Sequence, residues 1–176
     1  MRHDTMTWGE VARRLSAART YWLGTTMPSG APHAAPVWCV VTGQTLHLYS
    51  ERSTVKARNL AADPRIIVHL ESGEDVLIVR GVADDLGPPA SVPSVVAALA
   101  AKYTRPADQQ YLPSADPDFD VVYAIQPLSA IAWRLDDYAA SQRRWSSGLT
   151  TRYTACERVP AGAFHAIARD VPLTER

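Results

Sequence analysis

The chain has 176 residues, of which 47% are apolar and 20% are charged, a composition typical of a soluble globular domain. Its 18 basic and 18 acidic residues give a formal net charge of zero, so we expect neither nucleic acid nor a membrane surface as a partner. The two cysteines, Cys39 and Cys156, lie far apart and indicate a reducing compartment, and no stretch is apolar enough for a signal or membrane helix. We therefore expect one cytoplasmic domain over residues 1–176, with a tail over 146–176 that has no clear pattern.

The first part of the chain predicts one helix and three strands. Thr7 and Glu10 have the spacing of a capping box, and the apolar spacing that follows predicts a helix over residues 8–19. Strand-forming residues then occupy 21–25, 32–41 and 45–50, with turn signals at 27–30 and 42–44. Pro36 cannot donate to a strand ladder, so it predicts a sheet edge, a bulge or backbone that faces a ligand.

The second part predicts four more strands and a helix. The strands over 65–70 and 75–83 are apolar on both faces, which predicts burial on both sides, against a helix or a second subunit. Gly81 predicts a bend that helps to close the sheet. The remaining expected elements are a helix over 91–103, a long polar loop over 104–119, and a final hairpin of strands 121–126 and 130–134 around Pro127.

The segment from Ser50 to Leu60 combines hydroxyls, cations and a predicted helix start. A helix start carries a partial positive charge, and Arg and Lys bind phosphate oxygens, so this combination predicts a phosphate-binding turn. The alternative is a surface helix with solvated basic residues and Ser53 as its N-cap. The residues concerned are Ser50, Arg52, Ser53, Thr54, Lys56 and Arg58.

The order of these elements predicts a mainly β fold, an antiparallel barrel with attached helices. Other chemistries find little support in the sequence. His33, Cys39 and His47 lack the spacing of metal ligands, so we expect no metal site. There is also no nucleophile elbow, and neither a Walker nor a Rossmann glycine pattern.

Three stretches carry a family resemblance: YWLGTTMPSGAPHAAPVWCV, YSERSTVKARNLAADPRIIVHLES and DVLIVRGVA. In this order they resemble the split β-barrel flavin-binding superfamily of pyridoxamine 5′-phosphate oxidase, and within it the actinobacterial flavin/deazaflavin oxidoreductases. The resemblance covers residues 8–84 well and 121–145 loosely. It implies a six- to seven-stranded antiparallel split β-barrel of the FMN-binding type.

The resemblance also implies a homodimer that binds two cofactors, FMN or the deazaflavin coenzyme F-420, at the subunit interface. The cofactor phosphate is then expected at Ser50, Ser53, Thr54, Lys56 and Arg58, and its ring against Ala35, Pro36, Val37 and Trp38. Arg144 and Trp145 resemble an Arg-Trp pair that reaches the cofactor of the other subunit. Two alternatives stay open: Trp38 as a core residue, and Arg144-Trp145 as an exposed turn with one anchored tryptophan.

The implied function is an oxidoreductase that transfers a hydride to or from a small conjugated organic molecule. The chemistry would be centred on the cofactor, so no side chain is expected to be catalytic, and Trp38, the 104–119 loop and the partner's Trp145 would form the substrate walls. Pyridoxamine phosphate oxidases carry an Arg-x-His signature where this chain has RRWSSG over 143–148, so vitamin B6 oxidation is not expected. The alternatives are a non-catalytic carrier or sequestering protein for a flavin or another flat ligand, and a barrel that has lost its ligand.

Overall fold

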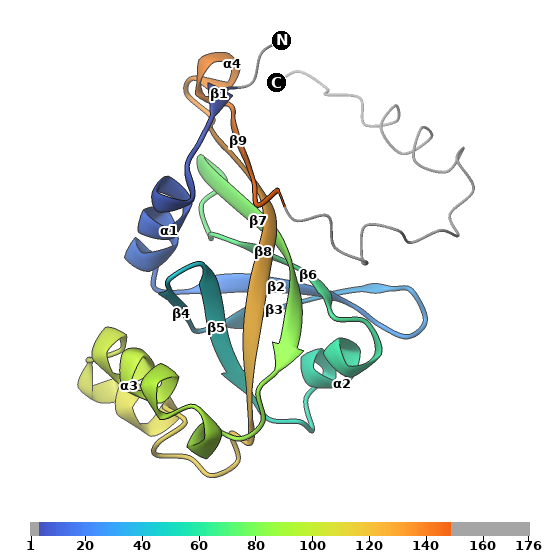
Figure 1. Ribbon diagram of the computed structural model, residues 1–176, viewed down its shortest axis with the longest axis vertical. Helices are drawn as coiled ribbons and strands as arrows, with labels where there is room; N and C mark the ends of the chain where they lie inside the picture. The colour runs from blue at the N-terminus through green and yellow to red at the C-terminus, as the bar shows by residue number, and fades with distance from the viewer. Residues whose placement is uncertain (1–3, 149–176) are drawn as a thin grey trace.

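A curled, mainly antiparallel β-sheet dominates the computed structural model, which describes residues 4–148 (Figure 1). Cys156 and residues 149–176 of the expected tail lie outside the described residues. The strands are β1 Asp4–Thr5, β2 Tyr21–Thr26, β3 Pro32–Val37, β4 Cys39–Thr42, β5 Thr45–Ser50, β6 Arg65–His69, β7 Asp75–Asp85, β8 Val121–Arg134 and β9 Arg143–Ser146. The helices are α1 Trp8–Ala17, α2 Val55–Ala62, α3 Pro93–Lys102 and α4 Tyr138–Ser141, with 3₁₀ turns η1 Pro89–Ser91 and η2 Pro106–Tyr111.

The sheet order is β1-β9-β8-β7-β6-β2-β3, and β5 pairs with both β4 and β8. All pairings are antiparallel except the parallel contact of β1 with β9. Because β8 pairs with β5, β7 and β9, it forms the wall shared by the two halves of the curled sheet. This arrangement confirms the predicted split β-barrel class.

The predicted final hairpin over 121–134 is wrong, because β8 is one continuous strand. The register of the β7–β8 ladder shifts at Arg80 and Gly81, and Pro127 is the partner of Gly81. At this irregularity a residue without an N–H is tolerated, so Pro127 passes through the sheet in a bulge and does not start a turn. A Cβ on Gly81 would lie 2.7 Å from the carbonyl oxygen of Gln126, which explains why glycine occupies the predicted bend.

The predicted strand over 32–41 is broken in two at Trp38. The first half, β3, pairs only with β2 and ends the sheet order, so of the three alternatives left open for Pro36 the structure shows the sheet edge. The second half, β4, pairs with β5. Trp38 itself belongs to neither ladder.

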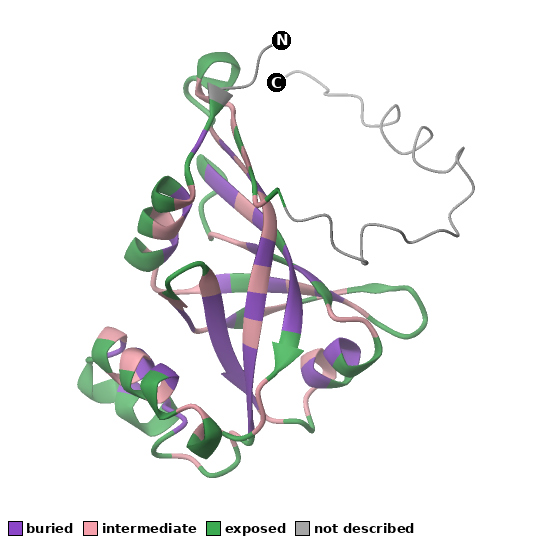
Figure 2. Cartoon of the chain, viewed as in Figure 1, coloured by how far each residue is buried: buried purple, intermediate pink, exposed green. Residues whose placement is uncertain are grey.

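Two apolar clusters hold the fold together, and buried residues line the inside of the curl (Figure 2). The larger fills the barrel with residues such as Leu23, Leu48 and Val68. The smaller packs α3 and η2 over β4, β5 and β8 through residues such as Leu99 and Val122. The prediction that strand 65–70 is buried on both sides is wrong within this chain: exposed and buried residues alternate along β6, and Ile67 is 39% exposed.

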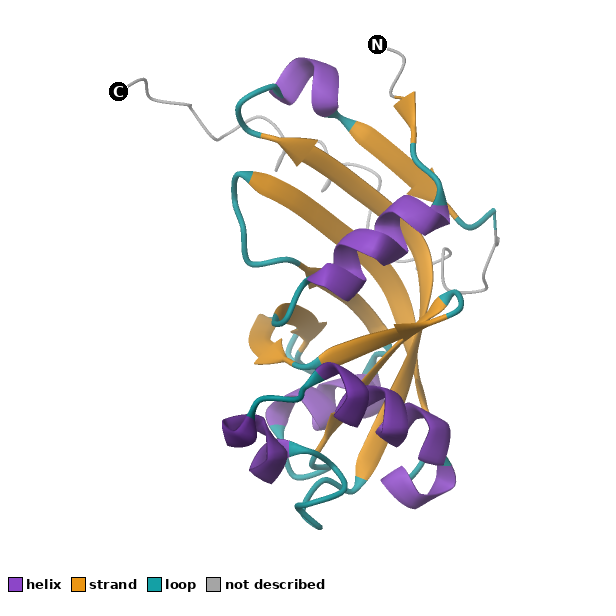
Figure 3. Cartoon of the chain, turned by 90° about the vertical axis from the view of Figure 1, so that its left-hand side faces the viewer, coloured by secondary structure: helices purple, strands orange, loops and turns teal. Residues whose placement is uncertain are grey.

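The helices α2, α3 and η2 gather at one end of the molecule, α4 lies at the other end, and α1 lies between them (Figures 1 and 3). The capping box of Thr7 and Glu10 begins α1, as predicted. The N-cap of α2 is Thr54, so the expectation of Ser53 is wrong by one residue. No helix among the described residues is long and apolar enough to span a membrane.

Candidate functional site

The start of α2 is an open helix end. The Thr54 hydroxyl accepts the N–H of Ala57 at 3.4 Å, donates to the carbonyl of Glu51 at 2.8 Å and lies 3.0 Å from the Ser50 hydroxyl. Within residues 4–148, the N–H groups of Val55 and Lys56 meet no acceptor. Unpaired N–H groups at a helix start attract an anion.

The three cations of the Ser50–Leu60 segment point in different directions. Arg52 binds both carboxylate oxygens of Asp85, at 2.6 and 3.0 Å, and Arg58 donates to the carbonyl of Ser53. Lys56 makes no hydrogen bond or ion pair within the described part of the chain. Burial lowers its pKa below the ordinary 10.5, and the nearby Glu51 opposes that shift. Lys56 is therefore a half-buried cation that an anion would stabilise.

Lys56 opens into a cavity of about 260 Å³, called here the Trp38 cavity. Its lining residues are Thr20, Pro36, Val37, Trp38, Tyr49, Ser50, Glu51, Thr54, Lys56, Tyr111 and Phe119. The cavity thus brings together predicted ring-site residues from the β3 edge and predicted phosphate-site residues from the start of α2. Ala35, Ser53, Arg58, Arg144 and Trp145 do not line it.

Aromatic rings form one side of the Trp38 cavity. The Trp38 ring is parallel to that of Tyr103, with centroids 4.2 Å apart and 4° between the planes. Tyr111 meets Trp38 edge-on at 6.3 Å, and Phe119 meets Tyr49 edge-on at 4.9 Å. Trp38 is only half-buried, so it is part of both the second apolar cluster and the cavity wall.

Arg144 and Trp145 lie on β9, so the exposed turn of the alternative is wrong, but its anchored tryptophan is confirmed. Trp145 packs against Trp8 with ring centroids 5.0 Å apart, and the Trp8 indole donates to the carbonyl of Gly43 at 2.8 Å. Arg144 is exposed. Trp145 is therefore anchored on its own chain, while the guanidinium of Arg144 faces outward.

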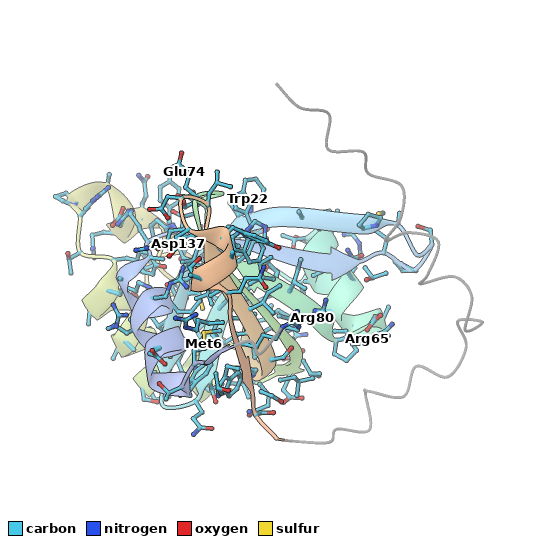
Figure 4. All side chains as sticks on the ribbon, turned by 90° about the horizontal axis from the view of Figure 1, so that it is seen from above. Met6, Trp22, Arg65, Glu74, Arg80 and Asp137 are labelled. Carbon is cyan, nitrogen blue, oxygen red and sulfur yellow. The ribbon has the colours of Figure 1, made fainter. Side chains whose placement is uncertain are left out.

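A second hollow, called here the outer groove, has a volume of about 880 Å³. The groove crosses the outer face of the sheet and is mostly apolar. Arg65 and Arg80 both line it and lie near each other (Figure 4). Arg65 also pairs with Asp63 at 2.5 Å. The remaining lining residues are Gly24, Thr25, Thr26, Pro32, His33, Ala34, Ile66, Ile67, Gly81, Val82, Leu128 and Ser129.

The sequence did not single out several of the residues that shape the Trp38 cavity. Thr20 and Tyr49 look like ordinary strand residues, and Glu51 is an acid beside the predicted phosphate site. The one sequence signal for Tyr49 is the alternation of side chains along β5, which predicts the face of the strand on which it lies. Tyr111 and Phe119 belong to the 104–119 loop that was predicted as a wall. Within residues 4–148, no three potential ligands gather into a metal site.

Several solved structures share the fold of this chain. An F-420 reductase structure shares 23% identity over 66% of this chain and 91% of its own, with a TM-score of 0.55. A conserved hypothetical protein from Mycobacterium tuberculosis shares 26% over 83% and 88%, with a TM-score of 0.59. A heme binding protein from Mycobacterium smegmatis shares 21% over 78% and 62%, with a TM-score of 0.57.

No curated protein sequence matches the chain. One family profile does, that of pyridoxamine 5′-phosphate oxidase, and it matches residues 7–129. This stretch includes every lining residue of the Trp38 cavity. The chain belongs to the pyridoxamine 5′-phosphate oxidase family.

Proposed function

We propose that the chain is a flavin- or deazaflavin-dependent oxidoreductase that transfers a hydride to or from a small conjugated organic molecule. The observation that carries this proposal is the Trp38 cavity, where the half-buried Lys56 and the open start of α2 lie beside the Trp38 ring. FMN and coenzyme F-420 both combine a phosphate with a flat ring system. The lining of the cavity fits such a group, because it combines a cation, hydroxyls and the open start of α2 with aromatic side chains.

The bound cofactor would supply the hydride chemistry, and the chain would bind, orient and shield it. Lys56 and the amides of Val55 and Lys56 would hold the phosphate. Trp38 and Pro36 would border the ring, and Tyr111 and Phe119 would keep water from the reacting face. Vitamin B6 oxidation is not part of the proposal, because the family's Arg-x-His signature is replaced here by Arg143, Arg144 and Trp145.

We further propose that the working unit is a homodimer. The Trp38 cavity of about 260 Å³ is smaller than the roughly 300–1,000 Å³ of typical ligand pockets, which suggests that one chain supplies only part of the site. Exposed apolar side chains such as Trp22 and Ile67 lie on the outer face of the sheet, where a second subunit would cover them.

The register of the sheet explains why Arg144 would serve the partner's site. Residues opposite each other on neighbouring strands share a face, and one such row runs from β3 to β9. Its members are Pro36, Trp22, His69, Ile78, Ile131 and Arg144. Five strand spacings of about 4.8 Å separate the ends of the row by about 24 Å along the sheet, far beyond the length of an arginine side chain. Arg144 therefore cannot reach the Pro36 end of its own chain along this face, but it is exposed on the face proposed to meet a second copy.

Titration of the purified protein with FMN and, separately, with coenzyme F-420 tests the cofactor assignment, and a substrate panel tests turnover. Binding of neither cofactor would refute the proposal. Sedimentation equilibrium tests the dimer: Ile67→Glu should yield monomers, while Leu135→Glu, which changes a more exposed leucine outside the outer groove, should not. A monomeric wild-type protein would refute the dimer.

The second candidate is a non-catalytic carrier of a flat ligand. The outer groove favours it, because it is larger than the Trp38 cavity and combines apolar walls with Arg65 and Arg80, groups that suit a flat acid. The two proposals differ in what they predict for this groove, because a dimer covers it and a carrier keeps it open. Cofactor binding without turnover over a broad panel, by a monomer, would favour the carrier.

A further inference from the structure

A buried tyrosine lies directly behind the aromatic wall of the Trp38 cavity. Tyr103, the C-cap residue of α3, is fully buried and its ring is stacked on that of Trp38. Its hydroxyl accepts the N–H of Cys39 at 2.9 Å and lies 2.8 Å from the carbonyl oxygen of Arg19 and 3.1 Å from that of Cys39. One side chain thus contacts both the ring of Trp38 and the peptide group that follows it.

These contacts matter because Trp38 lies at the break between two strands. The β2–β3 ladder ends at Val37 and the β4–β5 ladder begins at Cys39, so sheet pairing does not fix residue 38. Contacts from the last turn of α3 and its C-cap hold residue 38 in place. Besides Tyr103, this turn supplies Lys102, whose ammonium donates to the carbonyl of Cys39 at 2.9 Å.

The same corner ties Trp38 to the η2 turn. The guanidinium carbon of Arg19 lies 5.3 Å from the Trp38 ring centre and 5.6 Å from that of Tyr103. Arg19 also forms an ion pair with Asp108 of η2, and Tyr111 of η2 meets Trp38 edge-on. The ring of Trp38 is therefore contacted by Tyr103 at the end of α3 and by Tyr111 of η2.

We propose that Tyr103 is the positioning residue of the ligand site: it holds Trp38 as a flat wall against which a planar ring lies. The identity of that ring, FMN or coenzyme F-420, rests on the proposed function, whereas the placement of Trp38 rests on the contacts above. Without the hydroxyl, the Cys39 N–H would be left unpaired in a fully buried position, and the strand break that carries Trp38 would relax.

A double-mutant cycle tests this role, with the dissociation constants of FMN and coenzyme F-420 as the readout. In the wild-type background, Tyr103→Phe should weaken cofactor binding by about 2- to 10-fold, the range of one aromatic stack. In a Trp38→Phe background the same change should have little further effect, because the wall that Tyr103 positions is already altered. Equal, additive effects in both backgrounds would overturn the proposal even if Tyr103→Phe destabilises the protein.

A measurement without ligand separates this inference from the proposed function. The difference in tryptophan emission between the wild type and Trp38→Phe isolates the signal of Trp38, and acrylamide quenching reports its accessibility. Tyr103→Phe should increase the quenching of Trp38 by severalfold. An unchanged Trp38 signal would overturn the positioning role, whether or not either cofactor binds.

Tyr21→Phe is the matched control for both measurements. Tyr21 is equally buried, and its hydroxyl lies within hydrogen-bond distance of the carbonyls of Leu15 and Ala18 and accepts from the Lys102 ammonium. It shares Lys102 with Tyr103's corner, but it contacts neither the Cys39 N–H nor the Trp38 ring. Tyr21→Phe should lower stability as Tyr103→Phe does and leave the quenching of Trp38 unchanged. If Tyr21→Phe changed the Trp38 signal as much as Tyr103→Phe, general loosening would explain the effect and the proposal would fail.

Discussion

Replacement of Lys56 by methionine keeps most of the side-chain stem and removes the one cation of the Ser50–Leu60 segment that lines the Trp38 cavity. A charge-assisted hydrogen bond contributes about 1.5–3 kcal/mol, and each 1.4 kcal/mol corresponds to a factor of ten. Lys56→Met should therefore weaken cofactor binding by about 10- to 150-fold. Isothermal titration with FMN and coenzyme F-420 measures this change.

The matched control is Arg58→Met, two residues further along α2. The guanidinium of Arg58 is exposed, donates to the Ser53 carbonyl and does not line the cavity, so its loss should change affinity by less than about fivefold. Equal losses for the two variants would refute the assignment of Lys56 as the phosphate ligand. Unchanged affinity in Lys56→Met would refute the phosphate site altogether.

Lys56→Met should affect folding stability in the opposite direction from cofactor affinity. Burial lowers the pKa of Lys56 in the folded protein, so between that value and 10.5 the unfolded chain binds more protons. This residue's contribution to the free energy of unfolding therefore rises with pH across that interval, and Lys56→Met should abolish the rise. Without cofactor the variant should be at least as stable as the wild type by urea unfolding. Cofactor binding requires protonated Lys56, so wild-type affinity should fall as pH rises through the same interval, while that of the variant stays flat.

Three further predictions concern stability. Gly81→Ala should destabilise the fold by about 1–3 kcal/mol in urea unfolding, because its Cβ would lie 2.7 Å from the Gln126 carbonyl oxygen; Gly73→Ala, with open space around it, should not. Thr7→Ala should lower the free energy of unfolding by about 1 kcal/mol, because it removes the N-cap of α1. Thermal unfolding followed by helical circular dichroism measures this loss, and an unchanged melting temperature would contradict the role of the cap. Arg19 holds the pKa of Asp108 below its ordinary 3.8, so the stability that this carboxylate gives is present above that value and is lost as pH falls through the lowered pKa. Asp108→Asn should therefore reduce the loss of stability at acid pH. An identical dependence of stability on pH in the variant would argue against the ion pair.

Local patterns in the sequence were sufficient for most elements. The capping box of Thr7 and Glu10 and the apolar spacing after it predict α1 because both signals are confined to a few neighbouring residues. The edge strand was one of three alternatives that Pro36 indicated for a similarly local reason, its missing N–H. The order of the elements then predicted an antiparallel barrel, and the family resemblance refined this prediction to a split β-barrel.

Features that depend on distant partners were missed. Pro127 and Ser129 look like a turn, and only the pairing of residues 121–134 with β7 carries the chain straight through them. Trp38 looks like the continuation of a strand, and Tyr103, whose hydroxyl accepts the N–H of Cys39 at the break, is 65 residues away in sequence. Likewise, Arg52 and Arg58 resemble Lys56 in the sequence, and only the position of Asp85 on β7 and the direction of each side chain separate them.

The shared strand β8 has a consequence for synthesis of the protein. Its residues are made after those of β5 and β7, the strands whose edges it covers along most of their length. A nascent chain shorter than about 121 residues therefore carries two unpaired apolar edges, which are templates for association with other chains. Ribosome-bound intermediates of this length should be the stage at which the protein depends most on chaperones, and nonsense truncations before β8 should aggregate.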